Sequence, residues 1–181
     1  MLFANDTEEG LRSAAALVNT EDGEQLSDVG ALAQFARDWN WTGNLALDDD
    51  ELEAVRTLRP RLRSLWSGDE DQVVELVNGL LREFNALPQL VRHDSWDYHI
   101  HATPREAPLS ARMAVEAAMA FVDLVRSKEL SRLRVCASPD CDNVLVDLSK
   151  NRSRRFCESG CGNRAAVAAY RARLAERAQT A

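Results

Sequence analysis

Four cysteines in the last quarter of the chain restrict its fold more than any other feature. They are the only cysteines and form two close pairs, Cys136 with Cys141 and Cys157 with Cys161, with fifteen residues between the pairs. Two close pairs joined by a short segment are typical of a tetrahedral four-thiolate zinc site, because each pair closes a small loop around the metal. Four protein ligands leave no position for water, so the spacing predicts one structural, non-catalytic Zn²⁺.

Two disulfides, or unligated thiols, are the alternative for the same four residues. Residues 1–9 contain no apolar stretch of the kind that a secretory signal requires. We therefore expect a reducing, cytoplasmic environment, in which thiols stay unoxidised and metal binding is favoured. The sequence alone leaves both states open.

The residues around the cysteines predict the local fold. A knuckle at the first pair is followed by a strand over 143–148, a turn over 149–151 and a second short strand over 154–156. A helix then begins near Gly160 and carries the last ligand in its first turn. This order predicts a treble-clef-like zinc finger over residues 131–181.

The helix start carries a family resemblance. Cys161-Gly162-Asn163-Arg164 spells the motif that names the CGNR zinc fingers, and the cysteines and arginines before it are similar to that family. The N-terminal part resembles the ABATE domain that precedes this finger, at residues 17–20 and 96–101. The resemblance implies a bacterial, stress-linked transcription regulator. Phe156 replaces the usual Trp of the family, and Ala166 and Tyr170 replace frequent basic or His residues, which reduces the positive charge of the helix.

Charge is distributed unevenly along the chain. The whole chain has 22 basic and 29 acidic residues, yet residues 131–181 hold ten Lys or Arg against five Asp or Glu. A basic end on an acidic body is typical of proteins that bind a polyanion. We expect DNA, with phosphate contacts from six arginines: Arg152, Arg154, Arg155, Arg164, Arg171 and Arg173. The alternative is that these arginines are solvated or pair with acidic residues of the body or of a protein partner.

The last helix also has an apolar stripe. Val167, Tyr170 and Leu174 fall on one side of it. We expect the hairpin or the N-terminal domain to cover this stripe, and Phe156 and Tyr170 to serve in core packing.

The first 130 residues predict one helical domain with a small sheet. Helical spacing of apolar residues occurs over 11–18, 28–39, 48–66, 71–84 and 108–126, and segments 89–92 and 96–101 alternate like the strands of a hairpin around Asp94-Ser95. The fold class is therefore mainly α (α+β), with domains over 1–130 and 131–181 and no transmembrane segment. Expected members of one core are Leu17, Phe35, Leu62, Leu80 and Phe121.

The pair His99 and His101 is the strongest candidate for small-ligand chemistry. On a strand both imidazoles point to one face, where they could bind a metal or an anion, although a metal needs a third ligand that the sequence does not place. The competing interpretation is an ordinary polar side of a small sheet. The chain has no Gly-rich phosphate loop and no nucleophile elbow, so we expect no enzymatic activity.

The sequence therefore supports a DNA-binding transcription regulator whose N-terminal domain serves sensing or assembly. The alternatives are a zinc-finger protein-interaction module and a small-ligand-binding protein that uses His99 and His101. Expected partners are DNA, a second copy in a homodimer, and a small-molecule or protein signal. The expected location is the bacterial cytoplasm, at the nucleoid if the finger binds DNA.

Overall fold

The computed structural model describes residues 3–92 and 97–179. It is mainly helical, with two small antiparallel hairpins, as predicted. The N-terminal part contains α1 (Asn5–Asn19), α2 (Val29–Asp38), α3 (Asp49–Arg63), η1 (Ser64–Trp66), α4 (Glu70–Glu83), β1 (Gln89–Val91), β2 (His99–His101) and α5 (Leu109–Arg126). The C-terminal part contains η2 (Leu130–Arg132), β3 (Leu133–Val135), β4 (Val144–Val146) and α6 (Cys161–Gln179). None of the helices in these residues is both long enough and apolar enough to cross a membrane.

Three of the helices begin at an aspartate that caps the first turn. The side chain of Asp28 accepts a hydrogen bond from the Ala31 backbone N–H at 2.8 Å, and Asp48 caps α3 in the same way. Asp69 forms a reciprocal capping box with Gln72. Such caps satisfy N–H groups that a helix leaves unpaired, which explains why the helices begin at these residues.

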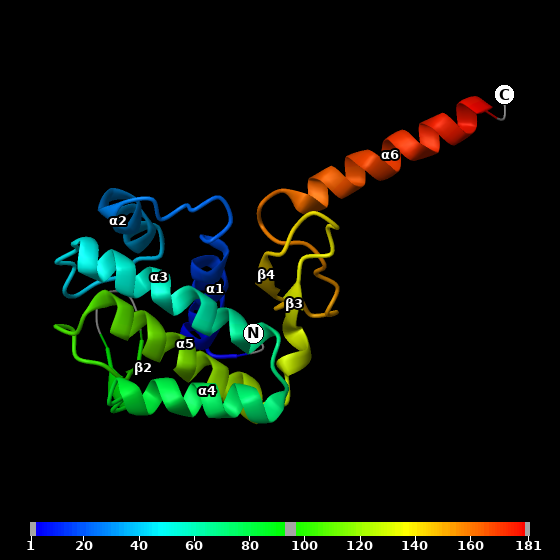
Figure 1. Cartoon of the computed structure of the whole chain (residues 1–181). Coiled ribbons are helices and arrows are strands. Elements are labelled where there is room, and N and C mark those ends of the chain that lie inside the picture. Colours follow the sequence, from blue (N-terminus) through cyan, green and yellow to red (C-terminus); the bar gives the residue numbers. More distant parts are fainter. Residues whose placement is uncertain (1–2, 93–96, 180–181) are drawn as a thin grey trace.

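Helix α5 lies at the centre of the N-terminal body, against α1, α3 and α4 (Figure 1). A side chain at Gly10 of α1 would place its Cβ 3.1 Å from the Cβ of Ala120, so the glycine permits the close approach of α1 and α5. Of the predicted core residues, Leu17, Leu62, Leu80 and Phe121 are buried, whereas Phe35 packs at the edge of the core and is only partly buried.

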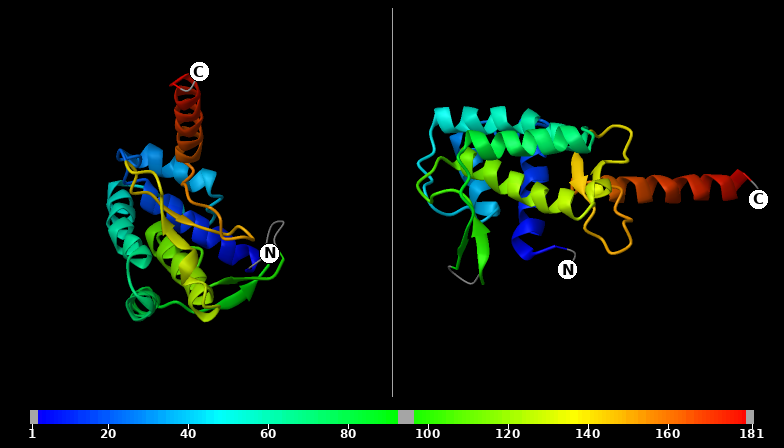
Figure 2. Two further views of the ribbon diagram at one scale, coloured as in Figure 1. Left: turned by 90° about the vertical axis from the view of Figure 1, so that its right-hand side faces the viewer. Right: turned by 90° about the horizontal axis from the view of Figure 1, so that it is seen from below.

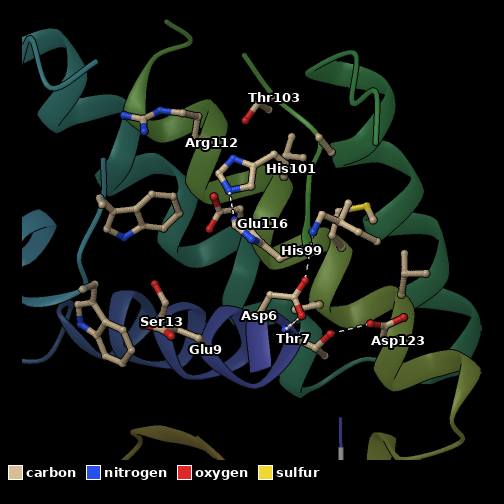
Figure 3. Close-up of a pocket in the computed structure, with 18 of the residues that line it drawn as sticks. Asp6, Thr7, Glu9, Ser13, His99, His101, Thr103, Arg112, Glu116 and Asp123 are labelled. Carbon is tan, nitrogen blue, oxygen red and sulfur yellow. Dashed lines mark hydrogen bonds between the residues drawn. The ribbon is translucent and has the colours of Figure 1, made fainter. Parts of the chain in front are cut away.

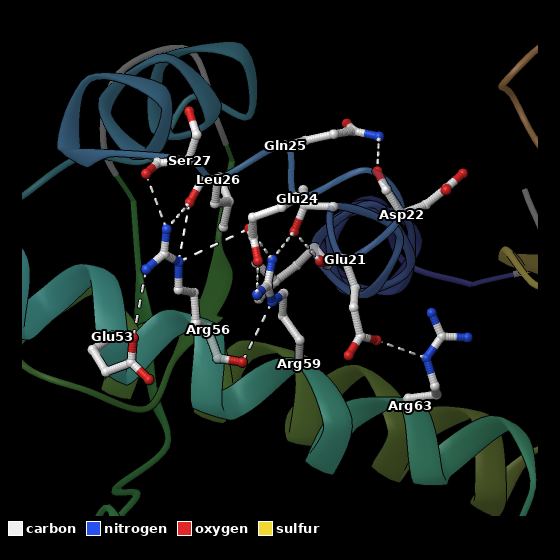
Figure 4. A network of polar contacts seen from close by, with 12 residues as sticks. Glu21, Asp22, Glu24, Gln25, Leu26, Ser27, Glu53, Arg56, Arg59 and Arg63 are labelled. Atoms are coloured by element: carbon white, nitrogen blue, oxygen red, sulfur yellow. Dashed lines mark hydrogen bonds and ion pairs between the residues drawn. The ribbon is translucent and has the colours of Figure 1, made fainter.

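Three arginines of α3 fix the loop between α1 and α2 (Figure 4). Arg59 forms a two-pronged ion pair with Glu24 at 2.8 and 2.9 Å. Arg56 donates to the carbonyls of Leu26 and Ser27. Arg63 donates to Glu21 at 3.2 Å. Local sequence patterns do not indicate this network, because its partners are 29 to 42 residues apart in the chain.

The first hairpin agrees with the prediction. Strands β1 and β2 pair antiparallel with Val91 opposite His99 and Gln89 opposite His101. The predicted turn at Asp94-Ser95 lies outside the described residues.

The second hairpin differs from the prediction. Strand β4 pairs with β3, which precedes the first cysteine, and residues 154–156 form no strand. The physical reason is Asp147, whose fully buried carboxylate accepts hydrogen bonds from the backbone N–H groups of Ser149 and Arg154. These bonds fold residues 147–154 into a loop around the carboxylate instead of a hairpin turn.

This second hairpin is built into the N-terminal core. Val144 and Val146 are buried in the same apolar cluster as the N-terminal helices. The Asn19 side chain pairs with β4 like a neighbouring strand, donating to the Val144 carbonyl at 2.8 Å and accepting from the Val144 N–H at 2.7 Å. Trp66 Nε1 donates to the Leu145 carbonyl at 3.0 Å. The base of the finger is therefore continuous with the N-terminal body.

Helix α6, in contrast, extends away from the rest of the molecule (Figures 1 and 2). Val167, Tyr170 and Leu174 are 49%, 57% and 46% exposed. The expectations that this stripe is covered and that Tyr170 serves in core packing are wrong, because β4 faces α1 and the hairpin gives α6 no surface to pack on. Phe156 does pack, against the cysteine cluster.

Candidate metal centre and nucleic-acid interface

The four cysteine sulfurs converge at the start of α6. All four Sγ atoms lie within 4.8 Å of one another, and Cys157 Sγ lies 3.7 Å from Cys141 Sγ and 3.5 Å from Cys161 Sγ. Sulfurs bound to a tetrahedral zinc at about 2.3 Å stand about 3.8 Å apart, whereas a disulfide requires about 2.05 Å. The cysteines are unpaired, so the geometry fits a metal site and does not fit disulfides.

Hydrogen-bond donors surround the sulfurs. The Cys157 N–H donates to Cys136 Sγ at 3.5 Å, and the buried Asn143 amide donates to Cys157 Sγ at 3.8 Å. The Arg164 guanidinium donates to Cys161 Sγ at 2.9 Å. Donors of this kind orient thiolate ligands and stabilise their negative charge.

The thiols do not ionise equally. Burial alone would raise the pKa of Cys157, but the Ser159 backbone N–H and the neighbouring cysteine sulfurs lower it to about 6. Burial and the same neighbouring sulfurs raise the pKa of Cys141 to about 12. Without a metal, ionisation of one of these thiols disfavours ionisation of its neighbours. A bound divalent cation removes this conflict, because its positive charge stabilises the thiolate form of all four.

The six predicted nucleic-acid contacts fall into two groups. Three are already engaged: Arg152 pairs with Glu129, Arg154 pairs with Glu158, and Arg164 binds the Ser159 carbonyl and the Cys161 sulfur. The others are exposed and have no acidic partner among the described residues: Arg155, Arg171 and Arg173. Arg155 lies over the Phe156 ring, 5.8 Å from its centroid.

Comparison with known families agrees with this geometry. A family model described as "CGNR zinc finger" matches residues 132–174. A second model, ABATE, described as "Putative stress-induced transcription regulator", matches residues 11–128, which is more than half of the chain. The chain belongs to the ABATE family. A search of curated proteins finds no match.

The ABATE domain contains a cavity of about 570 Å³ between α1, α5, β2 and the turn after α2 (Figure 3). His99 and His101 line it, so the structure places both predicted ligand residues at a cavity wall. The His99 Nδ1 bonds the Asp97 carbonyl at 2.8 Å, and the two Nε2 atoms are 2.9 Å apart. Because a carbonyl only accepts, neutral His99 carries its proton on Nδ1, and His101 donates from Nε2.

The carboxylates of the ABATE cavity were not identified from sequence. Glu116 of α5 and Glu9 of α1 line it. Burial, reinforced by the negative charges of Glu9 and Asp6, raises the pKa of Glu116 to about 7, although Arg112 opposes the shift. A charged residue within the apolar run of residues 113–121 was the available signal, but only the tertiary fold shows that it faces a cavity.

Proposed function

We propose that this protein is a zinc-containing transcription regulator that binds DNA through its C-terminal finger and senses a signal through its ABATE domain. One Zn²⁺ held by Cys136, Cys141, Cys157 and Cys161 fits the four-sulfur geometry. When bound, the ion supplies a fixed cross-link between the knuckle and the first turn of α6. The role is structural, because four thiolates occupy a tetrahedral shell completely.

The observation that supports DNA binding is the projection of α6 with uncompensated arginines on it. Arg171 and Arg173 stand on a helix that leaves the acidic body (Figure 1). Arg155 lies over the ring of Phe156, which contacts Gly162 in the first turn of that helix. Guanidinium groups that carry no internal ion pair are available for phosphate oxygens. Arg164 is better explained as a residue that positions Cys161, so we assign it no phosphate in this proposal.

DNA binding is tested by titrating the zinc-loaded full chain with a labelled duplex at several salt concentrations. Three phosphate contacts predict that log K falls against log salt with a slope of about −2.7. Arg173→Ala should make the slope shallower by about 0.9. Arg82→Ala, which removes an exposed arginine from α4, is the matched control and should leave the slope unchanged.

A second candidate function is a protein-interaction module. The exposed stripe of Val167, Tyr170 and Leu174 on α6 favours it, because apolar side chains gathered on one helix face are typical of protein contacts. The ion pair between Arg152 and Glu129 is also of the kind that this alternative predicts. Failure of the zinc-loaded protein to retain duplex near about 50 mM salt would reject DNA binding and favour this function.

A further inference from the structure

The cavity of the ABATE domain has an unbalanced charge. Glu9 and Glu116 line it, and neither carboxylate has a hydrogen bond or an ion pair among the described residues. Asp6 accepts from the backbone N–H groups of Thr7 and Ile100, and Asp123 accepts from the Thr7 hydroxyl. Two carboxylates of the cavity are therefore satisfied by the protein and two are not.

The arginines near the cavity offset this negative charge only in part, because Arg112 lowers the pKa of Glu116 but does not outweigh its burial. Arg112 is buried, and its guanidinium is committed to the backbone carbonyls of Thr42, Asn44 and Ala107. Arg126 lies at the rim, is 77% exposed and approaches Asp123. Arg105 is exposed. Glu9 and Glu116 thus face a space that favours a positively charged ligand.

Aromatic and apolar side chains line the cavity beside the histidines of β2. Trp39 and Trp41 line the cavity from the turn after α2, and Val115 and Met119 line it from α5. The indole Nε1 of Trp41 is buried and finds no acceptor among the described residues. Indole rings beside carboxylates are typical of sites that hold organic cations.

We propose that this cavity binds a small organic amine. The ammonium group lies between Glu9 and Glu116, and the body of the ligand packs against Trp39, Trp41 and Met119. A volume of about 570 Å³ suits a molecule of metabolite size. A metal ion fits less well, because no group of three His, Cys, Asp or Glu donors converges in the described part of this cavity.

The test uses the zinc-loaded full chain and three probes. Each probe carries a phenyl ring on a short alkyl chain, and the probes differ mainly in the charge of the end group. 2-Phenylethylamine is the cation, 3-phenylpropionate the anion and 3-phenylpropan-1-ol the neutral molecule, each titrated by calorimetry at pH 8. This pH lies above the pKa of about 7 of Glu116, so its carboxylate is ionised. We expect the amine to bind at least about tenfold more tightly than either analogue, as charge-assisted hydrogen bonds require.

Two variants locate the site. Glu116→Gln keeps the shape of the side chain and removes its charge, and should weaken amine binding at least about tenfold. Glu53→Gln, on the exposed face of α3, is the matched control and should change nothing. The amide introduced by Glu116→Gln imposes no buried charge, so a folding defect is not expected, and thermal denaturation checks this.

Equal binding of the three probes, or no binding of any, would overturn the proposal. Amine binding that Glu116→Gln leaves unchanged would also overturn it, as would binding of a divalent metal alone. These readouts involve no nucleic acid, so their outcome is independent of whether the finger binds DNA.

Discussion

Single residues of this chain have roles that their neighbours in sequence do not reveal. Asn19, at the end of α1, completes the edge of β4 with its amide, and Asp147 collects the backbone N–H groups of the loop after β4. Burial would raise the pKa of Asp147, but hydrogen bonds from Ser149 and Arg154 and the charge of Arg134 hold it below its ordinary value. Each residue replaces a backbone partner that the fold lacks at that position.

Replacement of Asn19 measures how much the contact between α1 and β4 contributes to stability. Asn19→Ala removes both hydrogen bonds to Val144 and leaves a partly buried N–H and carbonyl unpaired. We expect a loss of about 1–3 kcal/mol in the free energy of unfolding, measured by urea denaturation. Asn78→Ala, at an exposed position of α4, is the control. An Asn19 variant as stable as this control would show that β4 is held by packing alone.

Glu116 gives a pH-dependent prediction. Its pKa is about 7 in the folded protein, above the ordinary value of 4.5 that applies in the unfolded chain. Stability from this group is therefore fully present below about pH 4.5 and is lost as pH rises through about 7, at a cost of up to roughly 3 kcal/mol. Glu116→Gln should match the natural protein in melting temperature near pH 5 and exceed it at pH 8.

The neighbours of Glu116 require a control for this titration. Glu9 and Asp6 face it from α1, Arg112 from α5, and His99 and His101 from the hairpin. Histidine is the residue type whose charge most often changes near neutral pH. His101→Gln should therefore be compared over the same pH series, and an equal gain for Glu116→Gln at pH 5 and pH 8 would contradict the assignment to Glu116.

Among the elements, the helices of the N-terminal body were predictable and the connections between elements were not. Helix existence follows from apolar spacing and from caps such as Asp28, which are local signals. The partner of β4 was mispredicted because β3 lies on the other side of the first cysteine pair. The loop between α1 and α2 depends on arginines of α3, which no local pattern indicates.

The contact between α3 and this loop can be tested through Arg59. Arg59→Ala removes a buried guanidinium and its ion pair with the half-exposed Glu24, and should lower the free energy of unfolding by about 1–2 kcal/mol at pH 7. The Arg59 side chain lowers the pKa of Glu24, so this contribution is present above the unfolded pKa and disappears as pH falls through the folded value. A stability difference that stays constant in acid would attribute the loss to packing.

At the scale of the whole molecule, the sequence correctly indicated that the four cysteines come together, because two close pairs joined by a short segment favour one shared site. The exposure of α6 could not be predicted, since a stripe of Val167, Tyr170 and Leu174 indicates only that an apolar face exists, not what covers it. The unpartnered carboxylates of the cavity depend on the meeting of α1 and α5, which is a tertiary fact. The boundary near residue 130 is also less sharp than the charge distribution suggests, because Val144 and Val146 belong to the N-terminal core.

This shared core predicts how the protein responds to loss of its metal. Chelation of zinc, or Cys141→Ser, should release the knuckle and the start of α6, because the proposed zinc would be the main cross-link between them. The amides of β4 should stay protected, since Asn19 and the N-terminal helices hold that strand independently. Hydrogen–deuterium exchange followed by mass spectrometry distinguishes residues 136–143 and 154–164 from 144–146.

Ser138→Ala, inside the knuckle but without a metal-binding atom, is the control. Exchange of β4 at the same rate as the knuckle would show instead that the hairpin folds with the finger, and that residues 1–130 form a self-sufficient domain.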